Sequence, residues 1–588
     1  MKEWKFMALD KFYPVRKIHD LKDMLAQSCK LFRDKSAFLI KESDNQYREI
    51  SDFQFGNDVE AIGTALLELG LGSGLVAVLG ENRYEWCVTY LSVVNGVGTV
   101  VPMDKELPLD EIGNLLNRCE ASAIIFSGKY RNQMKNLVGS IPSIRYYIDM
   151  DLKQDEECFL SFNRLLESGK ELINAGDKRF QCAEVNSENM SALIFTSGTT
   201  DLAKGVMLSH RNICTNLTSV CSTVRIYSED ISLSILPMHH TYECTIGFLI
   251  MIYNGGTIAF NDGLKHISRN LQEVKPTFMV TVPLLLENMY RKIWDKVGKK
   301  KLMRAKFIAA LFFTNLLYIV LKKDIRKKVF KAVHESFGGR MRLIITGAAA
   351  IKPEVSKLFR RMGIQVLQGY GLTECAPLVA GNRDKSFVDN AGGLPIPGIE
   401  IKILNSDQKG IGEIAVKGDN VMIGYYQNDV ATNNCICDGW FHTGDLGYVD
   451  SKGFLYITGR LKNVIVTKNG KKIFPEEVET YINSSPFVQD SLVWGKYENK
   501  SGETFVCAQI LPNLEAIREK FELVSASKDE LMKIFNEVIK NVNKRMPLYK
   551  HIRQFTIREK EFVKTTTHKI KRYVEDPLVN RNKGGKYA

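Results

Sequence analysis

The chain has 588 residues, of which 45% are hydrophobic, 25% charged and 10% aromatic. These proportions are typical of a globular protein and exclude the disordered, collagenous and disulfide-scaffold classes, while the length allows about four domain-sized units. The net charge of +13 is concentrated in one segment, because 15 lysines and arginines stand against three acidic residues between Arg291 and Arg340. Such a local patch, without a recognition motif, does not indicate a nucleic-acid-binding protein.

The apolar stretches predict neither a signal peptide nor an ordinary transmembrane helix. Charged residues interrupt every apolar run near the N-terminus, and no window reaches about 18 uncharged apolar residues. Of the two longest uncharged stretches, 245–261 contains Gly255 and Gly256 and therefore predicts a helix, a turn and a strand. The twelve cysteines form no CxxC pair, which favours free thiols in a reducing compartment. We expect a cytoplasmic protein.

Short apolar runs alternate with helical patterns through about the first 450 residues. A helix is predicted at 84–94, after the first of these runs. Alternation of this kind is typical of an α/β protein with largely parallel sheets. From Gly412 the pattern changes to alternating residues with glycines, which predicts antiparallel strands at 413–418 and 453–458. The buried strands predicted before that point are 74–80, 123–126, 192–195 and 342–346.

The strongest local signal is the loop that follows the predicted strand at 192–195. It reads Thr196-Ser-Gly-Thr-Thr-Asp-Leu-Ala-Lys-Gly205. Free backbone N–H groups and hydroxyls in such a loop bind phosphate oxygens, and Lys204 adds a positive charge. The pattern GxxxxGK[ST] is absent, so this is not a Walker A loop. The alternative is a polar turn that only connects two elements.

A second signal is the segment Gln368-Gly-Tyr-Gly-Leu-Thr-Glu374. Two glycines flank Tyr370, which allows the backbone to approach a flat ligand while the ring stacks on it. Thr373 and Glu374 place a hydroxyl beside a carboxylate, a pair that suits a phosphate oxygen and a Mg²⁺ ion. The alternative is a strand end with a surface glutamate.

The C-terminal third carries three further segments of interest. In Thr443-Gly-Asp445 an aspartate follows a turn; it can accept hydrogen bonds from vicinal hydroxyls, as acidic residues do for ribose, or only satisfy its own turn. The segment 459–479 lies where the pattern changes and has the character of an inter-domain joint. The lysine-rich segment 564–572 could meet an anionic substrate, or could contribute surface charge alone.

Taken together, these segments resemble in order and content the adenylate-forming (AMP-binding) superfamily, which includes acyl-CoA synthetases, peptide-synthetase adenylation domains and luciferases. The resemblance extends from about Lys17 to Tyr573. Within the superfamily, the segments Leu236-Pro-Met-His-His-Thr-Tyr-Glu243, Thr346-Gly-Ala-Ala-Ala350 and Leu394-Pro-Ile-Pro-Gly398 most resemble those of bacterial long-chain fatty acid–CoA ligases.

Two positions depart from the family pattern. Ala203 stands where the family usually has proline before the lysine of its phosphate loop, which should loosen the loop without removing a phosphate ligand. His568 stands where the family usually has glycine before its C-terminal lysine, which costs strain if that position needs a positive φ. We still assign that lysine to Lys569.

The resemblance implies an ATP-dependent ligase that converts a fatty acid to acyl-AMP with release of pyrophosphate and then transfers the acyl group to CoA, with Mg²⁺ as cofactor. It implies that Glu374 and Thr196 hold the metal and that Thr373, Glu374, His240 and Lys569 are catalytic, with His240 at the acyl entrance. The implied ATP and AMP contacts are Thr196, Ser197, Gly198, Thr199, Thr200, Lys204, Gly347, Ala348, Ala349, Gln368, Gly369, Tyr370, Thr373, Asp445, Arg460 and Lys569.

The fold that the resemblance implies has a large N-terminal domain of parallel-rich α/β sheets with a small β-barrel-like part, followed by a small, mobile α+β domain. We place the N-terminal domain at 1–459, the hinge at 460–462 and the C-terminal domain, which carries Lys569, at 463–578. A polar tail occupies 579–588. In this family the small domain rotates about the hinge, so Lys462 and Gly470 would come to the CoA side.

A bulky residue in place of Gly470 is expected to spare adenylation and to block thioester formation, because glycine there would let the backbone line a narrow pantetheine tunnel. Pyrophosphate exchange measures the first half-reaction, and acyl-CoA formation measures both. Equal losses in the two assays would contradict this assignment.

The basic segment 291–340 contains an uncharged apolar stretch at 307–321 with lysines on both sides. As a helix this stretch would be about 22 Å long, too short to span a bilayer. One interpretation is an interfacial helix in peripheral contact with an anionic membrane, at its inner, cytoplasmic face. The others are a buried helix with solvated flanks and a patch that attracts ATP or CoA.

Other functions remain open at this point. An acyl-AMP ligase that loads an acyl carrier protein, and a ligase for medium-chain or aryl acids, would carry the same motifs. A non-catalytic binding protein on a ligase fold is disfavoured, because the charged positions expected of an active ligase are all present.

Overall fold

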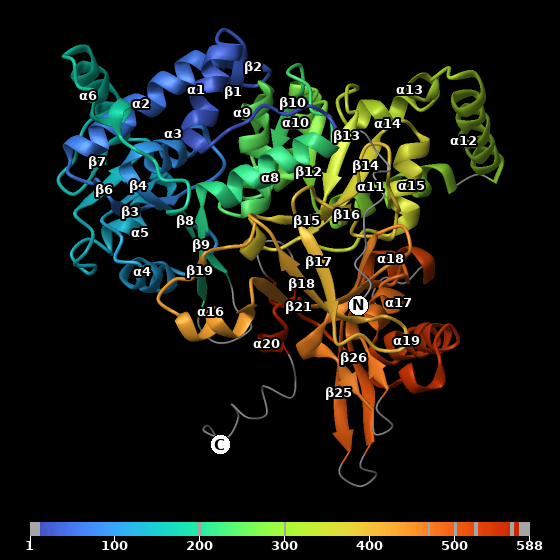
Figure 1. Ribbon diagram of the computed structural model, residues 1–588. Helices are drawn as coiled ribbons and strands as arrows, with labels where there is room; N and C mark the ends of the chain where they lie inside the picture. The colour runs from blue at the N-terminus through green and yellow to red at the C-terminus, as the bar shows by residue number, and fades with distance from the viewer. Residues whose placement is uncertain are drawn as a thin grey trace.

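The computed structural model of the protein describes residues 12–196, 203–298, 301–467, 471–498, 503–521, 527–564 and 570–575. Two large sheets lie side by side in the N-terminal part, and smaller sheets follow toward the C-terminus (Figure 1). The predicted α/β class with a large N-terminal and a small C-terminal domain is confirmed.

The first large sheet has eight strands and is parallel except where β9 pairs with β8 and β19. Its strands, in spatial order, are β19 (Gly424–Tyr425), β9 (Lys204–Ser209), β8 (Met190–Thr196), β4 (Gly98–Met103), β3 (Gly74–Leu79), β5 (Ala123–Phe126), β6 (Tyr146–Asp149) and β7 (Leu160–Ser161).

The second large sheet has nine strands, of which six are parallel and three join antiparallel at its edges. Its strands, in spatial order, are β16 (Leu394–Pro395), β15 (Leu378–Gly381), β14 (Gln365–Gly371), β13 (Leu343–Thr346), β12 (Phe278–Thr281), β10 (Ile231–Ser234), β11 (Thr257–Phe260), β1 (Ser36–Ser43) and β2 (Gln46–Ser51).

Alternate residues of one strand belong to different cores, because successive side chains of a strand point to opposite faces. In β3, Val76 and Val78 belong to the central core, whereas Ala77 and Leu79 belong to the outer core of the eight-stranded sheet. The nine-stranded sheet divides its residues in the same way. Both sheets therefore face one shared core, and each has a second core behind it.

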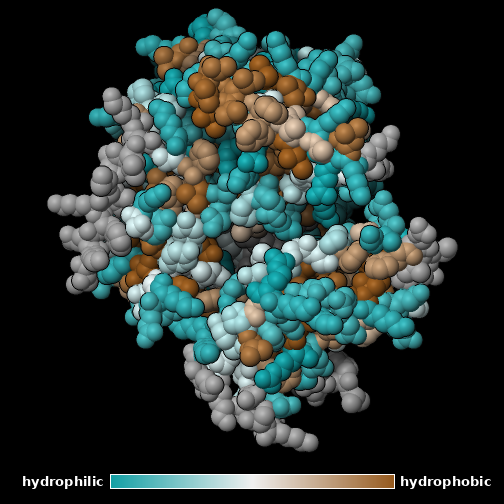
Figure 2. Space-filling model, turned by 90° about the vertical axis from the view of Figure 1, so that its right-hand side faces the viewer, coloured by the Kyte–Doolittle hydropathy of each residue, from teal (hydrophilic) through white to brown (hydrophobic). Residues whose placement is uncertain are grey.

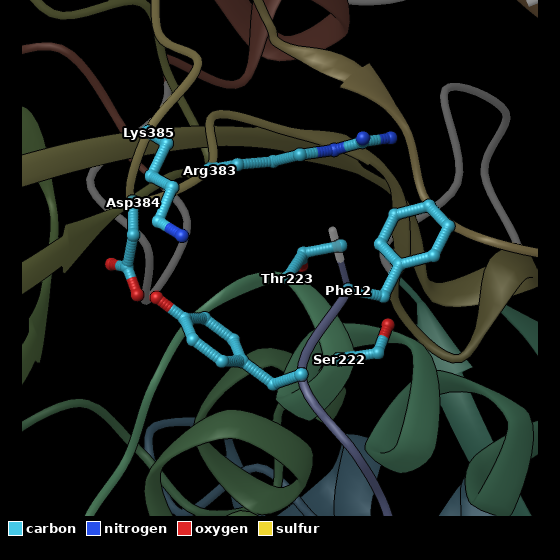
Figure 3. Close-up of a pocket in the computed structure, with 7 residues that line it drawn as sticks. Phe12, Ser222, Thr223, Arg383, Asp384 and Lys385 are labelled. Carbon is cyan, nitrogen blue, oxygen red and sulfur yellow. The ribbon is translucent and has the colours of Figure 1, made fainter. Parts of the chain in front are cut away.

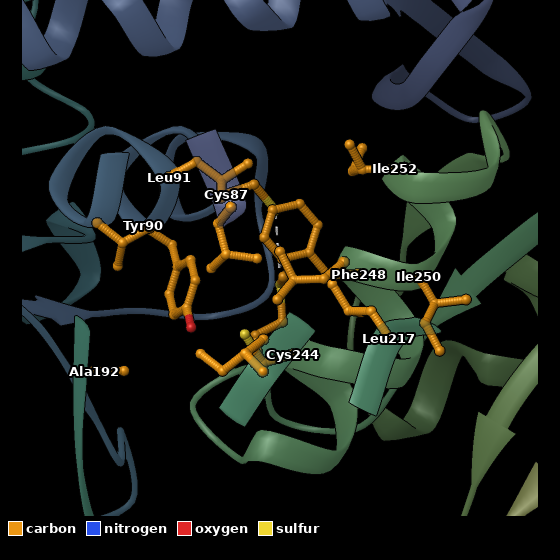
Figure 4. Close-up of a cluster of buried hydrophobic side chains, with 14 of the residues drawn as sticks. Cys87, Tyr90, Leu91, Ala192, Leu217, Cys244, Phe248, Ile250 and Ile252 are labelled. Atoms are coloured by element: carbon orange, nitrogen blue, oxygen red, sulfur yellow. Dashed lines mark hydrogen bonds between the residues drawn. The ribbon is translucent and has the colours of Figure 1, made fainter. Parts of the chain in front are cut away.

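The shared core is filled by helices that lie between the two sheets. Figure 4 shows side chains of α3 (Tyr84–Ser92), α8 (His210–Thr223), α9 (Ile250–Asn254) and the π-helix η3 (Glu243–Leu249) packed together. The helices α1 (Leu21–Phe32) and α2 (Asp52–Glu68) and the π-helix η1 (Val93–Val97) also contribute to this core.

Other helices cover the outer faces of the sheets. The eight-stranded sheet is covered by α4 (Leu109–Arg118) and α5 (Arg131–Lys135). The nine-stranded sheet is covered by α10 (Ile267–Val274), α11 (Pro283–Gly298), α12 (Lys301–Leu321), α14 (Lys331–Ser336) and α15 (Pro353–Arg361). The remaining helices of this part are α6 (Phe162–Asn174), α7 (Arg179–Cys182), α13 (Arg326–Val329) and α16 (Asp429–Cys435).

Local signals fix the ends of several helices. Ser209 and Asn212 form a capping box at the start of α8, which satisfies free N–H groups of the first turn. Gly255 ends α9 in the left-handed conformation, with φ 69°. The stretch 245–261 therefore contains a helix, a turn and the strand β11, as its sequence predicted.

The part predicted to be barrel-like is an antiparallel sheet of five strands. In it, β21 pairs with β18, β20 and β22, and β18 pairs with β17; no further pair among the described residues closes these strands into a ring. The strands are β17 (Glu400–Leu404), β18 (Gly412–Lys417), β20 (Ile436–Cys437), β21 (Trp440–Val449) and β22 (Leu455–Arg460).

The C-terminal part has a core of its own, from Ile465 to Ile552, and the predicted hinge at 460–462 falls just before it. The boundaries of the two domains stay a prediction. Lys352 joins the two parts by donating to the carbonyl oxygen of Asn483 at 3.2 Å. The elements here are β23 (Ile465–Val466), β24 (Lys472–Ile473), α17 (Pro475–Ile482), β25 (Val488–Glu498), β26 (Glu503–Pro512), α18 (Leu514–Phe521), α19 (Lys528–Asn543), β27 (Ile552–Ile557) and α20 (Arg572–Glu575).

One expectation is wrong. The apolar stretch 307–321 belongs to the longer helix α12, whose 21 residues make it about 31 Å long. By length and composition this helix could cross a membrane, but one such helix is weak evidence for a span. Only 11% of its apolar window is buried, so it is not an ordinary core helix. Lysine and arginine are good helix formers, so the charges at Lys301, Arg304 and Lys306 did not end the helix.

Candidate active site

Asp445 lies at the centre of the candidate site. It lies on β21 with 6% of its surface exposed, and its Oδ2 accepts a hydrogen bond from the Tyr370 hydroxyl at 2.8 Å. Its Oδ1 pairs with Arg460 Nε at 2.8 Å across the register of β21 and β22. Burial and the neighbouring carboxylate raise the pKa of Tyr370 well above its ordinary value. The phenol therefore stays protonated and keeps donating to Asp445.

The sequence predicted a turn before Asp445, but the structure has a bulge within β21 there, and this bulge fixes the direction of the carboxylate. Gly444 has φ 69°, in the left-handed region that favours glycine, and its N–H donates to Glu413 Oε1 at 3.1 Å. The backbone N–H of Asp445 donates to Thr443 Oγ1 at 3.1 Å. Glu413 and Thr443 thus accept from the backbone N–H groups of this bulge, and the Asp445 carboxylate is left for Tyr370, Arg460 and a ligand.

A second group links Glu374 to the predicted phosphate loop through Tyr425. The Tyr425 hydroxyl donates to Glu374 Oε1 at 2.9 Å, and Lys204 Nζ lies 4.6 Å from the centre of the Tyr425 ring. Tyr425 reaches this place because β19 pairs with β9, opposite Val206. Thr373 and Glu374 begin the 3₁₀ turn Thr373–Cys375, directly after β14.

The segment 347–349, which the family resemblance implies to contact ATP, follows β13. Thr346 is the register partner of Gln368 on β14, so Gly347, Ala348 and Ala349 begin beside the residues that lead to Gly369 and Tyr370. Ala348 has φ 67°, an uncommon conformation for alanine that is frequent at ligand sites. Gln368 supports the turn, because its Oε1 accepts from Ile351 N at 3.0 Å and its Nε2 donates to Ala391 O at 3.2 Å.

The ends of the predicted phosphate loop face each other across the hairpin of β8 and β9. Thr196 and Lys204 are register partners, and Arg118 donates to the carbonyl oxygen of Ala203 at 2.9 Å. Ser197, Gly198, Thr199 and Thr200 lie outside the described residues.

His240 lies on the loop between β10 and η3 and is partly exposed; its ring is tilted by 45° against that of His239, with 4.2 Å between ring centres. Asn82 holds this loop, since it donates to Leu236 O at 2.7 Å and accepts from Met238 N at 3.1 Å. His239 is buried, and burial, with the nearby charges of His240 and Lys105, lowers its pKa well below the ordinary value. His240 is thus the histidine of the pair that faces solvent.

The joint places Lys462 among charged neighbours. Lys462 follows Arg460 in the turn Leu461–Asn463, and partial loss of water, together with the cations Arg460 and Arg572, lowers its pKa to about 8. Arg572 is bound in turn by Glu479 of α17 and by Val493 O. Lys569 and Gly470 lie outside the described residues.

Three residues of this arrangement were missed from the sequence. Tyr425 sits in Gly424-Tyr-Tyr426, which has the composition of an ordinary turn, and only the pairing of β19 with β9 brings it to Glu374. Asn82 is far in sequence from the loop that it holds. Glu243 was quoted as part of a motif, but no local signal showed that its carboxyl is buried.

The pocket in Figure 3 lies elsewhere and does not contribute to the site. The N-terminal segment with Phe12 and Tyr13 packs there against Arg383, Asp384 and Lys385 (Figure 3). Its volume of 10 Å³ holds about one water molecule. Tyr13 N donates to Ser222 O at 2.8 Å, so the contact fastens the N-terminal segment to the domain.

Comparisons with known proteins assign the chain to a family. A family model described as "AMP-binding enzyme" matches residues 25–426, and one described as "AMP-binding enzyme C-terminal domain" matches residues 462–574. The chain belongs to the AMP-binding enzyme family. The C-terminal match begins at Lys462, within the predicted hinge 460–462.

Relatives within the family cover most of the chain. "Long-chain-fatty-acid--CoA ligase FadD15" of Mycobacterium tuberculosis is 25% identical over 92% of this chain and 93% of its own length. "Fatty acyl-CoA synthetase B" of Dictyostelium discoideum is 25% identical over 95% of this chain and 90% of its own. Human "Long-chain-fatty-acid--CoA ligase 1" is 27% identical over 81% and 71%.

Solved structures of other proteins share the fold. The anthranilate CoA ligase AuaEII in complex with anthranoyl-AMP has a TM-score of 0.74 at 20% identity, covering 97% of this chain and 98% of its own. The Mycobacterium tuberculosis fatty acyl CoA synthetase has a TM-score of 0.64 at 20% identity, covering 96% and 99%. At this identity the likeness establishes the fold alone.

Replacing Tyr425 with phenylalanine is expected to raise the Mg²⁺ concentration at half-maximal adenylation about three- to tenfold. The ring beneath Lys204 would remain, but Glu374 would lose the hydrogen bond that orients it, which is worth about 1 kcal/mol. Mg²⁺ titration of pyrophosphate exchange measures the change, and Tyr426→Phe on the adjacent residue serves as control. Equal Mg²⁺ dependence in wild type and Tyr425→Phe would contradict this role.

Replacing Glu243 with glutamine is expected to remove a loss of stability that the wild type shows between about pH 5 and pH 8. Burial raises the pKa of Glu243 from 4.5 to about 8; its Oε1 accepts from Ser234 at 2.6 Å, and its carboxyl packs against Gly247. Below pH 4.5 Glu243 is protonated in both the folded and the unfolded state, so its contribution to stability is complete. As the pH rises through about 8 this contribution is lost, because the unfolded state ionises first. The free energy of unfolding therefore falls by about 3 kcal/mol between pH 5 and 8.

Melting temperatures measured from pH 5 to 8.5 test this assignment. The wild type should lose more stability than Glu243→Gln over this range, whatever the offset at pH 5. Glu335→Gln, an exposed change, should follow the wild type. Parallel curves for wild type and Glu243→Gln would show that Glu243 does not titrate in this range.

Proposed function

We propose that this protein is an ATP-dependent, AMP-forming ligase that joins a long-chain fatty acid to CoA. The observation that carries the proposal is the ribose-type carboxylate Asp445, held by Tyr370 and Arg460. Tyr370 lies in the same segment as Glu374, which Tyr425 links to the phosphate-loop lysine Lys204. Membership of the AMP-binding enzyme family and relatives named as long-chain fatty acid–CoA ligases support the acid class.

The reaction proceeds in two balanced steps. A carboxylate oxygen forms a bond to the α-phosphorus of ATP while the bond to the β-bridging oxygen breaks, which gives acyl-AMP and pyrophosphate. The CoA thiolate then attacks the acyl carbon, and AMP leaves with the electron pair of the broken C–O bond. Both reactants of the first step are anions, so positioning and charge neutralisation carry most of the catalysis.

The chain's own residues divide the work of the first step. Asp445 accepts from the ribose hydroxyls and Tyr370 stacks on the adenine beside the turn at Gly347. Lys204 and the loop after Thr196 bind the β- and γ-phosphates, and Thr373 contacts the α-phosphate. Lys569 would bridge the carboxylate and the α-phosphate as a compact cation, and His240 would line the acyl entrance.

The residues present fit a Mg²⁺ ion. Glu374 uses Oε1 to accept from Tyr425, whereas its Oε2 makes no hydrogen bond to another described residue. Mg²⁺ needs only one or two carboxylates when substrate phosphates supply further ligands, so Glu374, with help from Thr196, would hold it. When bound, the ion neutralises charge on the phosphates.

CoA is the acceptor that we favour, because the relatives are named as CoA ligases. Lys462 lies at the joint about which the C-terminal domain would rotate between the two steps. An acyl carrier protein is the second candidate acceptor. We further propose that the enzyme is cytoplasmic and peripheral on the inner face of an anionic membrane, in contact through the basic segment 291–340.

Incubation with ATP, Mg²⁺, CoA and a mixture of acids from acetate to stearate, with benzoate added, tests the function by mass spectrometry. We expect a long-chain acyl-CoA from the wild type and its collapse in Lys569→Ala. Accumulation of acyl-AMP without thioester would direct the search to a carrier protein. If no acid gives either product, the proposed function is wrong.

A further inference from the structure

The helix α12 exposes a continuous apolar face. Its outer side chains include Phe312 and Phe313, which are 64% and 60% exposed, and Ile319 and Val320, which are both 65% exposed. Figure 2, which views the side of the molecule that carries α12, shows brown side chains gathered in the upper part of this face with teal ones around them. A helix that is apolar all round is ordinarily buried on all sides, so an exposed face of this size indicates a partner.

The opposite face of α12 is fastened to the domain. Leu311 and Thr314 are buried, the Phe307 ring packs against Trp294 and Phe330, and Asn315 donates to Arg361 O at 2.9 Å. The Arg326 guanidinium lies 3.9 Å from the centre of the Tyr318 ring. These contacts recur every three or four residues and therefore lie on one face of the helix, the inward stripe, which packs on the domain. The opposite face, with the exposed apolar side chains, points outward.

Cations gather at both ends of the apolar face. Arg326 pairs with Asp324, but the neighbouring cations are exposed and make no ion pair with another described residue. They are Lys301, Arg304 and Lys306 before the exposed phenylalanines, and Lys322, Lys323, Lys327 and Lys328 after the helix.

We infer that α12 docks in the plane of an anionic lipid surface, with Phe312, Phe313, Ile319 and Val320 in the acyl layer and the two clusters of cations among the headgroups. Interfacial helices bind in this way, through buried apolar area and attraction to anionic lipid. The inference deepens the peripheral location proposed above and rests on it; the ligase reaction itself needs no membrane.

The charge of the segment 291–340 favours a lipid surface over a second copy of the chain as the partner that covers α12. Covering α12 with α12 of another copy would bring together two segments that each carry 15 basic and three acidic residues, and like charges oppose that contact. An anionic surface complements the same charges. The inward stripe decides between lying in the plane and spanning, because a span would require Phe307, Leu311, Thr314 and Asn315 to leave their partners.

Co-sedimentation of the full chain with lipid vesicles tests the inference. We expect binding to vesicles of phosphatidylglycerol and phosphatidylcholine, little binding to pure phosphatidylcholine, and about tenfold weaker binding in 500 mM than in 50 mM NaCl, since salt screens exposed charges. No binding to the anionic vesicles at low salt would overturn the inference, and so would equal binding to both vesicle types.

The variant Phe312→Ser/Phe313→Ser is expected to bind these vesicles at least about tenfold more weakly, because two exposed rings would no longer be transferred into the acyl layer. The matched control is Val430→Ser/Leu548→Ser, which removes apolar residues that are 74% and 84% exposed elsewhere. Control and wild type should bind alike. Unchanged binding of Phe312→Ser/Phe313→Ser would show that α12 is not the docking element.

Two further measurements test the alternatives, a membrane span by α12 and a dimer through α12. Carbonate washing of the vesicles should release the protein, and resistance to it would overturn docking in the plane. Sedimentation velocity without vesicles should give a monomer at low salt; a dimer lost in Phe312→Ser/Phe313→Ser would assign the face to a second copy. Acyl-CoA formation from a soluble acid without vesicles should be equal in all variants, so failure of the ligase and failure of docking are distinguishable.

Discussion

Replacing Asp445 with asparagine is expected to lower kcat/KM for ATP about 100- to 1000-fold. The Asp445 carboxylate is 6% exposed, accepts from Tyr370 and pairs with Arg460. An amide of the same shape would lose the ion pair and one acceptor position for the ribose hydroxyls. A hydrogen bond to a charged group is worth about 1.5–3 kcal/mol. Arg460 is partly exposed, so two losses near the low end of this range account for the expected effect.

Pyrophosphate exchange at varied ATP concentration measures this effect, and Asp450→Asn is its matched control. Asp450 lies in the turn that joins β21 to β22 and also accepts from a tyrosine, Tyr456, at 3.3 Å, but it is not among the residues that surround Asp445. We expect Asp450→Asn to keep its activity within about threefold. Equal losses of activity in the two variants would mean that Asp445 stabilises the sheet and does not bind the ribose.

Asp445 also shows which features of the site could be predicted from the sequence. The segments around Tyr370 and Asp445 each predicted a ligand contact from their own residue types. Neither predicted that the two side chains bond to each other, because they belong to different sheets and are separated by 75 positions. The type of a residue indicates which ligand it can bind. Whether two distant segments come into contact depends on strand register and on how the sheets pack.

The same limit applies to the fold. Strands at 74–80, 123–126 and 342–346 were predicted because apolar runs bounded by turn residues are a local signal, and the structure has β3, β5 and β13 there. The order of these strands within the sheets is not local and was not predicted. The length of α12 was wrong because lysines were read as boundaries, although no glycine or proline interrupts Lys301–Leu321.

Replacing Glu374 with glutamine is expected to lower the rate of acyl-AMP formation by about 100- to 1000-fold at saturating ATP. Removing one group that stabilises charge in a transition state costs about 2.7–4 kcal/mol, and an amide is a poor ligand for Mg²⁺. The Tyr425 hydroxyl can still donate to the side-chain oxygen of glutamine, so the local structure should survive. Single-turnover formation of acyl-AMP at varied Mg²⁺ measures the loss.

The matched control for Glu374 is Glu273→Gln. Glu273 also accepts from a tyrosine, Tyr47, at 2.9 Å, on the far edge of the nine-stranded sheet, and its loss should leave the Mg²⁺ dependence unchanged even if the protein melts earlier. AMP carries no β- or γ-phosphate, so its affinity for Glu374→Gln should stay within about threefold of the wild type. A large loss of AMP affinity would instead place Glu374 at the nucleoside.

The comparison of Glu374→Gln with Tyr425→Phe separates two roles of this pair. Tyr425→Phe keeps the negative charge and loosens its direction, whereas Glu374→Gln keeps the hydrogen bond and removes the charge. If charge on the phosphates limits the reaction, the second change must be at least about tenfold more severe than the first. If the two variants were equally impaired, orientation of the turn Thr373–Cys375 would be the function of the pair, and the metal would have to be held elsewhere.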